Sequence, residues 1–253
     1  MTAQTGELPL AGLRTVVTGA SSGIGRAIAI AFAAAGARVG IGFWNSADAA
    51  QALADQLGPV HPLLRADLCT PDGCSSIVRG AFAALENIDV WVNNAGADVL
   101  TGEAAGWPAE RKLDALLDLD LKGTIRCSQL VAARMLPGGC ILNIGWDHAT
   151  ADGMAGEDPE LFGAVKAGVL GFSKSFARSV APDVRVNVLC PGWIETAFGA
   201  GVDRTFYDEV AATTPLRRWG RPDDVAGAAV WLASPAAAFV TGQAVNVNGG
   251  VVG

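Results

Sequence analysis

A glycine-rich turn near the start of the chain has residue types and spacing suited to binding a pyrophosphate. It occupies residues 18–25, directly after the apolar run 13–17 and directly before an alanine-rich helical pattern. Gly19 permits a tight turn, Gly23 lets the backbone approach the phosphates, and Gly25 lets the helix pack closely. The first N–H groups of that helix then face the anion. Because no Gly-Lys-Ser/Thr follows, the GxxxGxG spacing favours a dinucleotide site over a nucleoside triphosphatase loop.

Short β-rich apolar runs alternate with alanine- and leucine-rich helical patterns along the rest of the chain. This alternation predicts an α/β fold, a Rossmann-type doubly wound parallel sheet of about seven strands flanked by helices on both faces. No linker or repeat divides the 253 residues, so we predict a single dinucleotide-binding domain over residues 1–253. The expected strands are 13–17, 38–43, 60–64, 88–92, 140–144, 184–189 and 244–247, and the expected helices are 24–35, 47–57, 71–86, 109–136, 160–180 and 223–233.

Composition and charge narrow the classes of partner. The net charge is −7 without a basic block, so nucleic acid is not an expected partner. Residues 1–14 lack a basic stretch followed by an apolar run, which argues against a signal peptide. The uncharged stretch 225–253 is interrupted by Ser234-Pro235 and Asn248-Gly249-Gly250, which argues against a membrane helix. A small-molecule substrate is the expected partner.

Cysteine and histidine usage points away from disulfide and metal chemistry. The five cysteines are scattered without a CxxC spacing, which favours reduced structural thiols in a cytoplasmic protein. The two histidines have no ligand spacing, so no metal site is expected.

One long insertion interrupts the alternation. Residues 199–221 fall between the sixth expected strand and a helix that begins with Pro222 in its first turn. In a doubly wound sheet, ligands bind beyond the carboxyl ends of the strands, where this insertion must lie. We therefore predict a substrate lid at 199–221, with an irregular loop as the alternative.

Several motifs in the right order make the chain resemble the short-chain dehydrogenase/reductase family. Residues 18–25 match its cofactor turn, Asp67-Leu68 its adenine-contacting pair, Asn93-Asn94-Ala95-Gly96 its NNAG motif, and residues 191–196 its loop beside the nicotinamide. The resemblance implies a seven-stranded sheet and, commonly, a homotetramer built on the helices near 109–136 and 160–180, with a dimer as the other oligomer considered. The cofactor contacts it implies, with the end of the second strand included, are Gly19, Ser21, Ser22, Gly23, Ile24, Gly25, Asn45, Ser46, Asp67, Leu68, Asn93, Ala95, Gly96, Lys166, Pro191, Gly192, Ile194 and Thr196.

The end of the second strand bears on which nicotinamide cofactor is bound. NAD sites usually place a carboxylate there to bind the ribose 2′-hydroxyl. Residues 43–46 read Phe-Trp-Asn-Ser, so nothing acidic repels a 2′-phosphate, and Asn45 and Ser46 could bind one. No arginine stands in this stretch, and Ser22 occupies a position where NADP-preferring relatives often carry one. We predict NADP, with NAD as the alternative.

The resemblance also shows which catalytic groups are missing. In the family a tyrosine transfers the carbinol proton, a lysine four residues later tunes it and binds the ribose, a serine polarises the carbonyl, and an asparagine holds a water. Here the lysine is Lys166, but the tyrosine position is Phe162, the serine position is Trp146 and the asparagine position is Asp120. Hydride addition to a carbonyl leaves an alkoxide that must be neutralised. The family's proton transfer therefore cannot be assigned to these residues.

Asp147 and His148, directly after Trp146, are the candidate proton-handling residues at the mouth of the expected site. Imidazole titrates near neutrality, and burial can retune a carboxylic acid. The alternative for each is a capping or loop-tip residue.

Lys166 and the acids before its helix complete the candidates. Lys166 lies four residues after Phe162, so both project from one helical face, and we expect the lysine to anchor the ribose. Glu157 and Asp158 are expected to solvate the loop before the helix.

A substrate that is already cationic needs little help from an acid. Trp146, Phe162 and Trp193 would offer flat apolar walls and a cation–π surface to an iminium or pterin-like ring, although ordinary pocket lining is an equal alternative. We therefore predict an NAD(P)(H)-dependent oxidoreductase, a reductase of C=N or of activated C=O or C=C groups. The alternatives are an inactive nucleotide-binding homologue and a non-redox lyase or cyclase that uses the same pocket.

Overall fold

The computed structural model describes residues 8–252, and within them seven strands form one parallel sheet in the order β3-β2-β1-β4-β5-β6-β7. The predicted doubly wound fold is confirmed. The prediction of no signal peptide falls partly on residues 1–7, outside the described range. The strands are β1 (Arg14–Val17), β2 (Arg38–Phe43), β3 (Leu63–Arg65), β4 (Val90–Asn93), β5 (Gly139–Ile144), β6 (Val184–Pro191) and β7 (Ala244–Val247).

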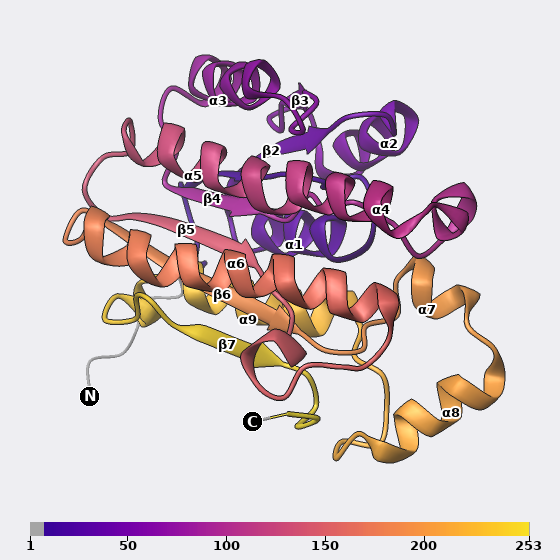
Figure 1. Cartoon of the computed structure of the whole chain (residues 1–253). Coiled ribbons are helices and arrows are strands. Elements are labelled where there is room, and N and C mark those ends of the chain that lie inside the picture. Colours follow the sequence, from indigo (N-terminus) through magenta and orange to yellow (C-terminus); the bar gives the residue numbers. More distant parts are fainter. Residues whose placement is uncertain (1–7, 253) are drawn as a thin grey trace.

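Helices cover both faces of the sheet (Figure 1). On one face α1 and α9 pack together, with Phe32 and Leu232 fully buried; on the other, α3, α5 and α6 cover a second apolar layer that contains Trp91. The α-helices are α1 (Gly23–Ala34), α2 (Ala47–Leu57), α3 (Pro71–Leu85), α4 (Ala109–Leu116), α5 (Thr124–Ala132), α6 (Glu157–Val180), α7 (Ala197–Gly201), α8 (Arg204–Thr213) and α9 (Pro222–Ala233); shorter turns are η1 (Gly102–Gly106), η3 (His148–Thr150) and η4 (Pro235–Ala237).

Successive strands are added to one side of β1 up to β3 and to its other side from β4 onward, and this change of side places the ligand cleft. β1 pairs with β2 on one side and with β4 on the other, so the loops after β1 and β4 meet at the carboxyl edge. Thr18 joins them: its hydroxyl accepts the backbone N–H groups of Asn94 and Ala95, both at 3.0 Å, and donates to the Val92 carbonyl at 3.2 Å. The glycine turn and the NNAG motif are thereby fixed against each other.

The helix expected over 109–136 is interrupted, and the interruption places a charged residue in the site. Between α4 and α5 lies the π-helical segment η2 (Leu117–Gly123). π-Helical turns inside helices are frequent at functional sites. Asp120 lies within this segment and is almost fully buried.

Helix α6 begins three residues earlier than expected. Glu157 and Asp158 form its first turn rather than a loop, where acidic side chains favour the positive end of the helix dipole. Asp158 also pairs with Lys112 of α4 at 2.8 Å, so the prediction that it only solvates a loop is wrong.

The insertion at 199–221 contains structure of its own. Helix α7 and helix α8 extend away from the sheet beyond its carboxyl edge (Figure 1). The aromatic rings of Phe206 and Trp219 pack against Trp193, which follows β6. This placement is the one expected of a lid; its movement stays a prediction.

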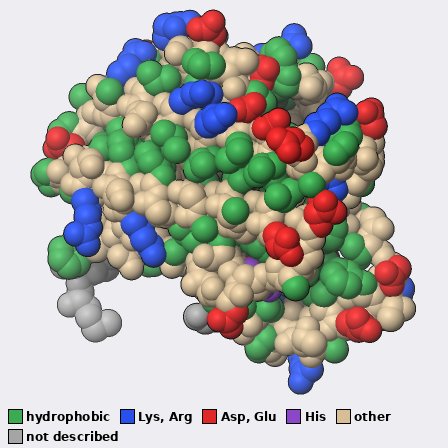
Figure 2. Space-filling view, viewed as in Figure 1, with side chains coloured by type: hydrophobic (Ala, Val, Ile, Leu, Met, Phe, Trp, Pro, Cys, Tyr) green, Lys and Arg blue, Asp and Glu red, His purple; other side chains and the backbone are tan. Residues whose placement is uncertain are grey.

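The face formed by α5 and α6 carries a band of apolar side chains (Figure 2). Leu130 of α5 is among the exposed large apolar residues of the described chain. The predicted tetramer or dimer would use this face, and it remains a prediction. No helix within residues 8–252 is long and apolar enough to cross a bilayer.

Candidate active site

A cleft of about 550 Å³ opens at the carboxyl edge of the sheet, between the glycine turn and α6. It runs from the end of β2 to Lys166, and so has two ends, one beside Trp44 and one beside Phe162. Of the predicted cofactor contacts it is lined by Gly19, Ser21, Ser22, Gly23, Ile24, Asn45, Ser46, Asp67, Leu68, Ala95, Gly96, Lys166 and Thr196.

The glycines of the turn are required by close approaches. Gly19 has φ of +63°, and a Cβ there would lie 2.9 Å from the Cα of Ala95. A Cβ on Gly25 would lie 2.3 Å from the Gly19 carbonyl oxygen. Gly25 thus allows the helix to pack closely against the turn and does not line the cleft, in keeping with its expected packing role.

Besides Gly25, four predicted cofactor contacts lie outside the cleft lining. Asn93 is buried, and its side chain bonds to Trp91, Ser128 and Asn143, at 2.7, 2.9 and 2.8 Å; its neighbour Asn94 lines the cleft in its place. Strand alternation explains this difference, since successive side chains point to opposite faces. The other three are Pro191, Gly192 and Ile194.

At the β2 end of the cleft, the structure supplies a cation that the sequence pattern did not indicate. Arg65 ends β3, directly beside Phe43 in the register of the sheet. Its guanidinium lies 4.9 Å from the ring centre of Trp44 and donates to the Trp44 carbonyl at 3.1 Å. A positive charge therefore lies against Trp44, the residue directly before Asn45 and Ser46.

At the other end, the ammonium of Lys166 is held by three neighbours. Its Nζ lies 2.9 Å from Asp120 Oδ2, donates to the Ile144 carbonyl at 3.1 Å, and is 5.2 Å from the ring centre of Phe162. The second oxygen of Asp120 accepts the backbone N–H of Ala97 at 2.8 Å. The lysine thus faces a carboxylate on one side and an aromatic ring on the other.

Gly96 makes room for this ion pair. A Cβ on Gly96 would come within 2.9 Å of Asp120 Oδ2. The glycine that ends the NNAG motif therefore lets the Asp120 carboxylate approach the cleft.

Asp147 and His148 form a second pair after β5. Asp147 is fully buried, so its predicted place at the mouth of the site is wrong. Its Oδ1 accepts the backbone N–H of His148 at 2.8 Å and lies 2.9 Å from His148 Nδ1. Because a fully buried side chain cannot meet a substrate directly, Asp147 can act only through the half-buried imidazole beside it.

Aromatic rings connect this pair to Lys166. Trp146 stacks on the His148 imidazole at 4.9 Å and meets the edge of Phe162 at 5.3 Å, while Trp193 lies 6.3 Å from His148. The three predicted pocket aromatics are thus joined by ring contacts through His148, and Phe162 is the one of the three that lines the cleft.

Cys190, at the end of β6, lies near both charged pairs. Burial, and after it the charge of Asp147, raises the pKa of this thiol to about 12. Thiolates, not thiols, are the nucleophilic form of cysteine, so Cys190 has no role as a nucleophile at neutral pH.

The single tyrosine of the sequence does not replace the missing phenol. Tyr207 belongs to α8, stacks on Trp219 at 5.0 Å, and donates its hydroxyl to Glu195. The hydrogen bond to Glu195 raises the pKa of Tyr207, which makes the phenol a weaker acid. We expect Tyr207→Phe to change kcat by less than about threefold, far below the roughly 10²- to 10⁴-fold of general acid catalysis, because its hydroxyl is bonded to Glu195 and its ring stacks on Trp219. Steady-state NADPH oxidation measures this; a loss of a hundredfold or more would identify Tyr207 as the proton donor.

Comparison with known proteins agrees with this geometry. The sequence profile of the family described as Enoyl-(Acyl carrier protein) reductase matches residues 19–252. The 3-oxoacyl-[acyl-carrier-protein] reductase of Synechocystis sp. is 35% identical over 264 residues, covering 100% of this chain and 99% of that protein.

Two solved structures extend the comparison. A blue fluorescent protein from a metagenomic library, in complex with NADPH, is 31% identical with a TM-score of 0.87, covering 97% of this chain and 100% of that one. A short chain dehydrogenase from Burkholderia cenocepacia J2315, in complex with NADP, is 30% identical with a TM-score of 0.86, covering 96% and 99%. The chain therefore belongs to the short-chain dehydrogenase/reductase family of oxidoreductases.

Proposed function

We propose that this chain is an NADPH-dependent reductase whose substrate accepts hydride without a tyrosine acid. The preferred substrate class is a C=N group that carries positive charge, an iminium or a protonated pterin-like ring. The observation that carries the proposal is the surroundings of Lys166, whose ammonium meets the ring of Phe162 and the carboxylate of Asp120. Bound NADPH would supply the hydride.

The balance of buried charge favours a cationic substrate. Within residues 8–252, the carboxylates of Asp120 and Asp147 and the ammonium of Lys166 are buried near this end of the cleft. Lys166 pairs with Asp120. The other buried carboxylate of the three groups is Asp147, which lies beside His148. A buried charge is costly unless it is compensated, so a cationic substrate is stabilised here.

The three pocket aromatics support the same substrate class. Cations bind over aromatic faces with about 0.5 to 2 kcal/mol of stabilisation. Trp146, Phe162 and Trp193 supply such faces, and hydride addition to an iminium carbon gives a neutral amine that requires no further proton. For a neutral imine or an activated C=O, the proton would come from Nε2 of a His148 ring that carries a proton on both nitrogens, with Asp147 orienting the ring.

NADP is the proposed cofactor. The Burkholderia and metagenomic neighbours hold NADP and NADPH, which supports this choice. We assign the adenosine 2′-phosphate to the surface made by Asn45, Ser46 and Arg65.

Arg65→Ala should reduce the preference for NADPH over NADH by about tenfold, since a charge-assisted hydrogen bond contributes about 1.5 to 3 kcal/mol. Calorimetric Kd values for both nucleotides measure the ratio. Arg38→Ala is the matched control, because Arg38 also donates to backbone carbonyls but at the start of β2. An equal loss for NADPH and NADH would remove Arg65 from the 2′-phosphate site.

The names of the relatives suggest a second candidate, reduction of a 3-oxoacyl thioester. Overall similarity favours it. The substitutions at Phe162 and Trp146 weigh against it, because a neutral ketone becomes an alkoxide that must be protonated.

The test is NADPH oxidation against a panel of cyclic iminium ions, oxidised pterins and 3-oxoacyl thioesters. The proposal expects turnover with the first two classes. Calorimetric NADPH binding without oxidation by any member would favour the inactive homologue. Product formation without loss of the reduced nicotinamide absorbance would favour a lyase or cyclase.

A further inference from the structure

We propose that Asn248, in the turn after β7, is a positioning residue that fixes Asp147 and thereby holds His148 as its Nδ1–H tautomer. The Nε2 atom is then the one left to exchange a proton. The inference rests on the proposed function only in this last point. The tautomer itself follows from the hydrogen bonds.

Both oxygens of the Asp147 carboxylate are occupied by donors. Oδ1 receives the backbone N–H of His148, and Oδ2 receives Asn248 Nδ2 at 3.2 Å. Since backbone and amide N–H groups can only donate, the carboxylate acts here as an acceptor. The Nδ1 of His148, 2.9 Å from Oδ1, must then be the donor of that contact.

The orientation of the Asn248 amide is fixed by two further bonds. Its Oδ1 accepts the backbone N–H of Gly250 at 3.0 Å, and its Nδ2 donates also to the Val252 carbonyl at 2.8 Å. A flipped amide would place its oxygen against two acceptors, the Val252 carbonyl and the Asp147 carboxylate. The donor end therefore faces Asp147.

The backbone leaves space for this contact at Gly192. A Cβ on Gly192 would lie 2.7 Å from Asn248 Cβ and 3.0 Å from Asp147 Oδ2. The role of Gly192 is therefore to let the turn after β7 reach the carboxylate.

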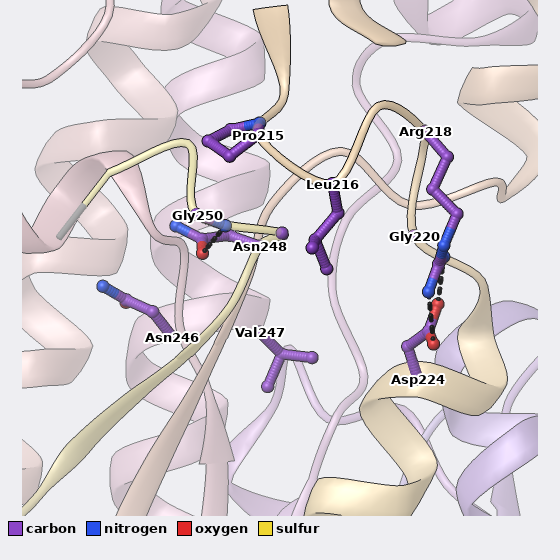
Figure 3. A pocket seen from close by; sticks show the side chains of 10 residues that line it. Pro215, Leu216, Arg218, Gly220, Asp224, Asn246, Val247, Asn248 and Gly250 are labelled. Carbon is purple, nitrogen blue, oxygen red and sulfur yellow. Dashed lines mark hydrogen bonds and ion pairs between the residues drawn. The ribbon is translucent and has the colours of Figure 1, made fainter.

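The turn that carries Asn248 also contacts the end of the insertion. Gly249 and Gly250 have φ of +66° and +88°, and the Gly249 carbonyl accepts the backbone N–H of Leu216 at 3.2 Å. The turn after β7 and the end of the insertion border a cavity of about 570 Å³. Asn248 lies beside Leu216 on one side of this cavity, and the Arg218–Asp224 ion pair lies on the other (Figure 3). The Asp147–His148 pair is thus connected through Asn248 to the segment after α8.

The histidines of the chain provide an internal comparison. Only His61 and His148 are present in the sequence. The Nδ1 of His61 accepts the backbone N–H of Val39 at 3.0 Å, so neutral His61 must carry its proton on Nε2. Burial lowers the pKa of His61, which keeps it neutral. The two rings should therefore show opposite tautomers.

The experiment is a histidine 1H–15N long-range correlation spectrum of the full-length, 15N-labelled protein at a pH where both rings are neutral. We expect Nδ1–H for His148 and Nε2–H for His61. In Asn248→Ala, at least half of the Nδ1–H population of His148 should be lost while His61 is unchanged. Asn246→Ala is the matched control, since its amide oxygen accepts from Thr150 Oγ1 at 3.3 Å, whereas the Asn248 amide donates to Asp147. Nε2–H for wild-type His148, or an Asn248→Ala spectrum like the wild type, would overturn the proposal.

An exchange of the two side chains separates position from charge. The double variant Asp147→Asn, Asn248→Asp keeps an amide–carboxylate hydrogen bond but moves the charge away from His148. We expect its thermal midpoint to recover relative to both single variants, while the wild-type tautomer does not return. Full recovery of that tautomer would contradict the proposal. A tautomer that shifts in Asn248→Ala without any change in NADPH oxidation would uphold the positioning role and refute proton transfer by His148.

Discussion

Replacing Asp120 with alanine is expected to lower the free energy of unfolding by about 3 to 5 kcal/mol, the cost of leaving one member of a buried ion pair without its partner. The ammonium of Lys166 would stay buried among Ile144, Phe162 and the empty space left by the carboxylate. The backbone N–H of Ala97 would lose its acceptor as well. Chemical denaturation followed by circular dichroism gives the value.

Asp118→Ala is the matched control. Asp118 lies in the same π-helical segment and pairs with Lys122 at 2.8 Å, but both side chains are about half exposed. Exposed ion pairs contribute about 0 to 1 kcal/mol, so this variant should be close to the wild type. Equal losses in the two variants would show that the buried pair has no special role.

Rebuilding the missing groups should convert the site to a reductase of neutral ketones. The triple variant Phe162→Tyr, Trp146→Ser, Asp120→Asn restores a phenol, a hydroxyl and an amide at the three substituted positions. General acid catalysis contributes about 10²- to 10⁴-fold, so we expect kcat/KM for a 3-oxoacyl thioester to rise at least about a hundredfold. The assay is steady-state NADPH oxidation.

Phe162→Tyr alone should give little of this gain. Trp146 would still fill the place of the serine, and Asp120 would still neutralise the ammonium that has to stabilise a phenolate. A single variant as active as the triple would show that the phenol is the one missing group. A wild type as active as the triple would show that the proton already has a donor.

Much of the fold could be predicted because local signals agree with one another. The strands 38–43 and 244–247 were predicted to the residue, since apolar β-rich runs bounded by polar or glycine residues have few alternatives. The interruption at η2 could not be predicted, because the pattern over 109–136 is compatible with a continuous helix. Its cause is tertiary: Asp120 reaches Lys166 and Ala97, contacts far apart in sequence.

The site residues, too, divide into those with a local sequence signal and those that depend on tertiary contacts. The cleft residues were found because the glycine turn has the spacing of a pyrophosphate site and because the other motifs resemble those of a known family. Arg65 and Asn248 were missed as partners, since the first reaches Trp44 across two strands and the second reaches Asp147 from the far end of the chain. Spacing along a sequence does not show such contacts, and the burial of Asp147 was missed for the same reason.

Deuteride transfer from stereospecifically labelled NADPH to a cyclic iminium substrate is the most direct test of hydride delivery without a tyrosine. The proposed function predicts one deuterium on the former C=N carbon of the product, from one face of the nicotinamide only, with matching oxidation to NADP. Protein that binds NADPH in calorimetry but transfers no label to any iminium, pterin or thioester would contradict it.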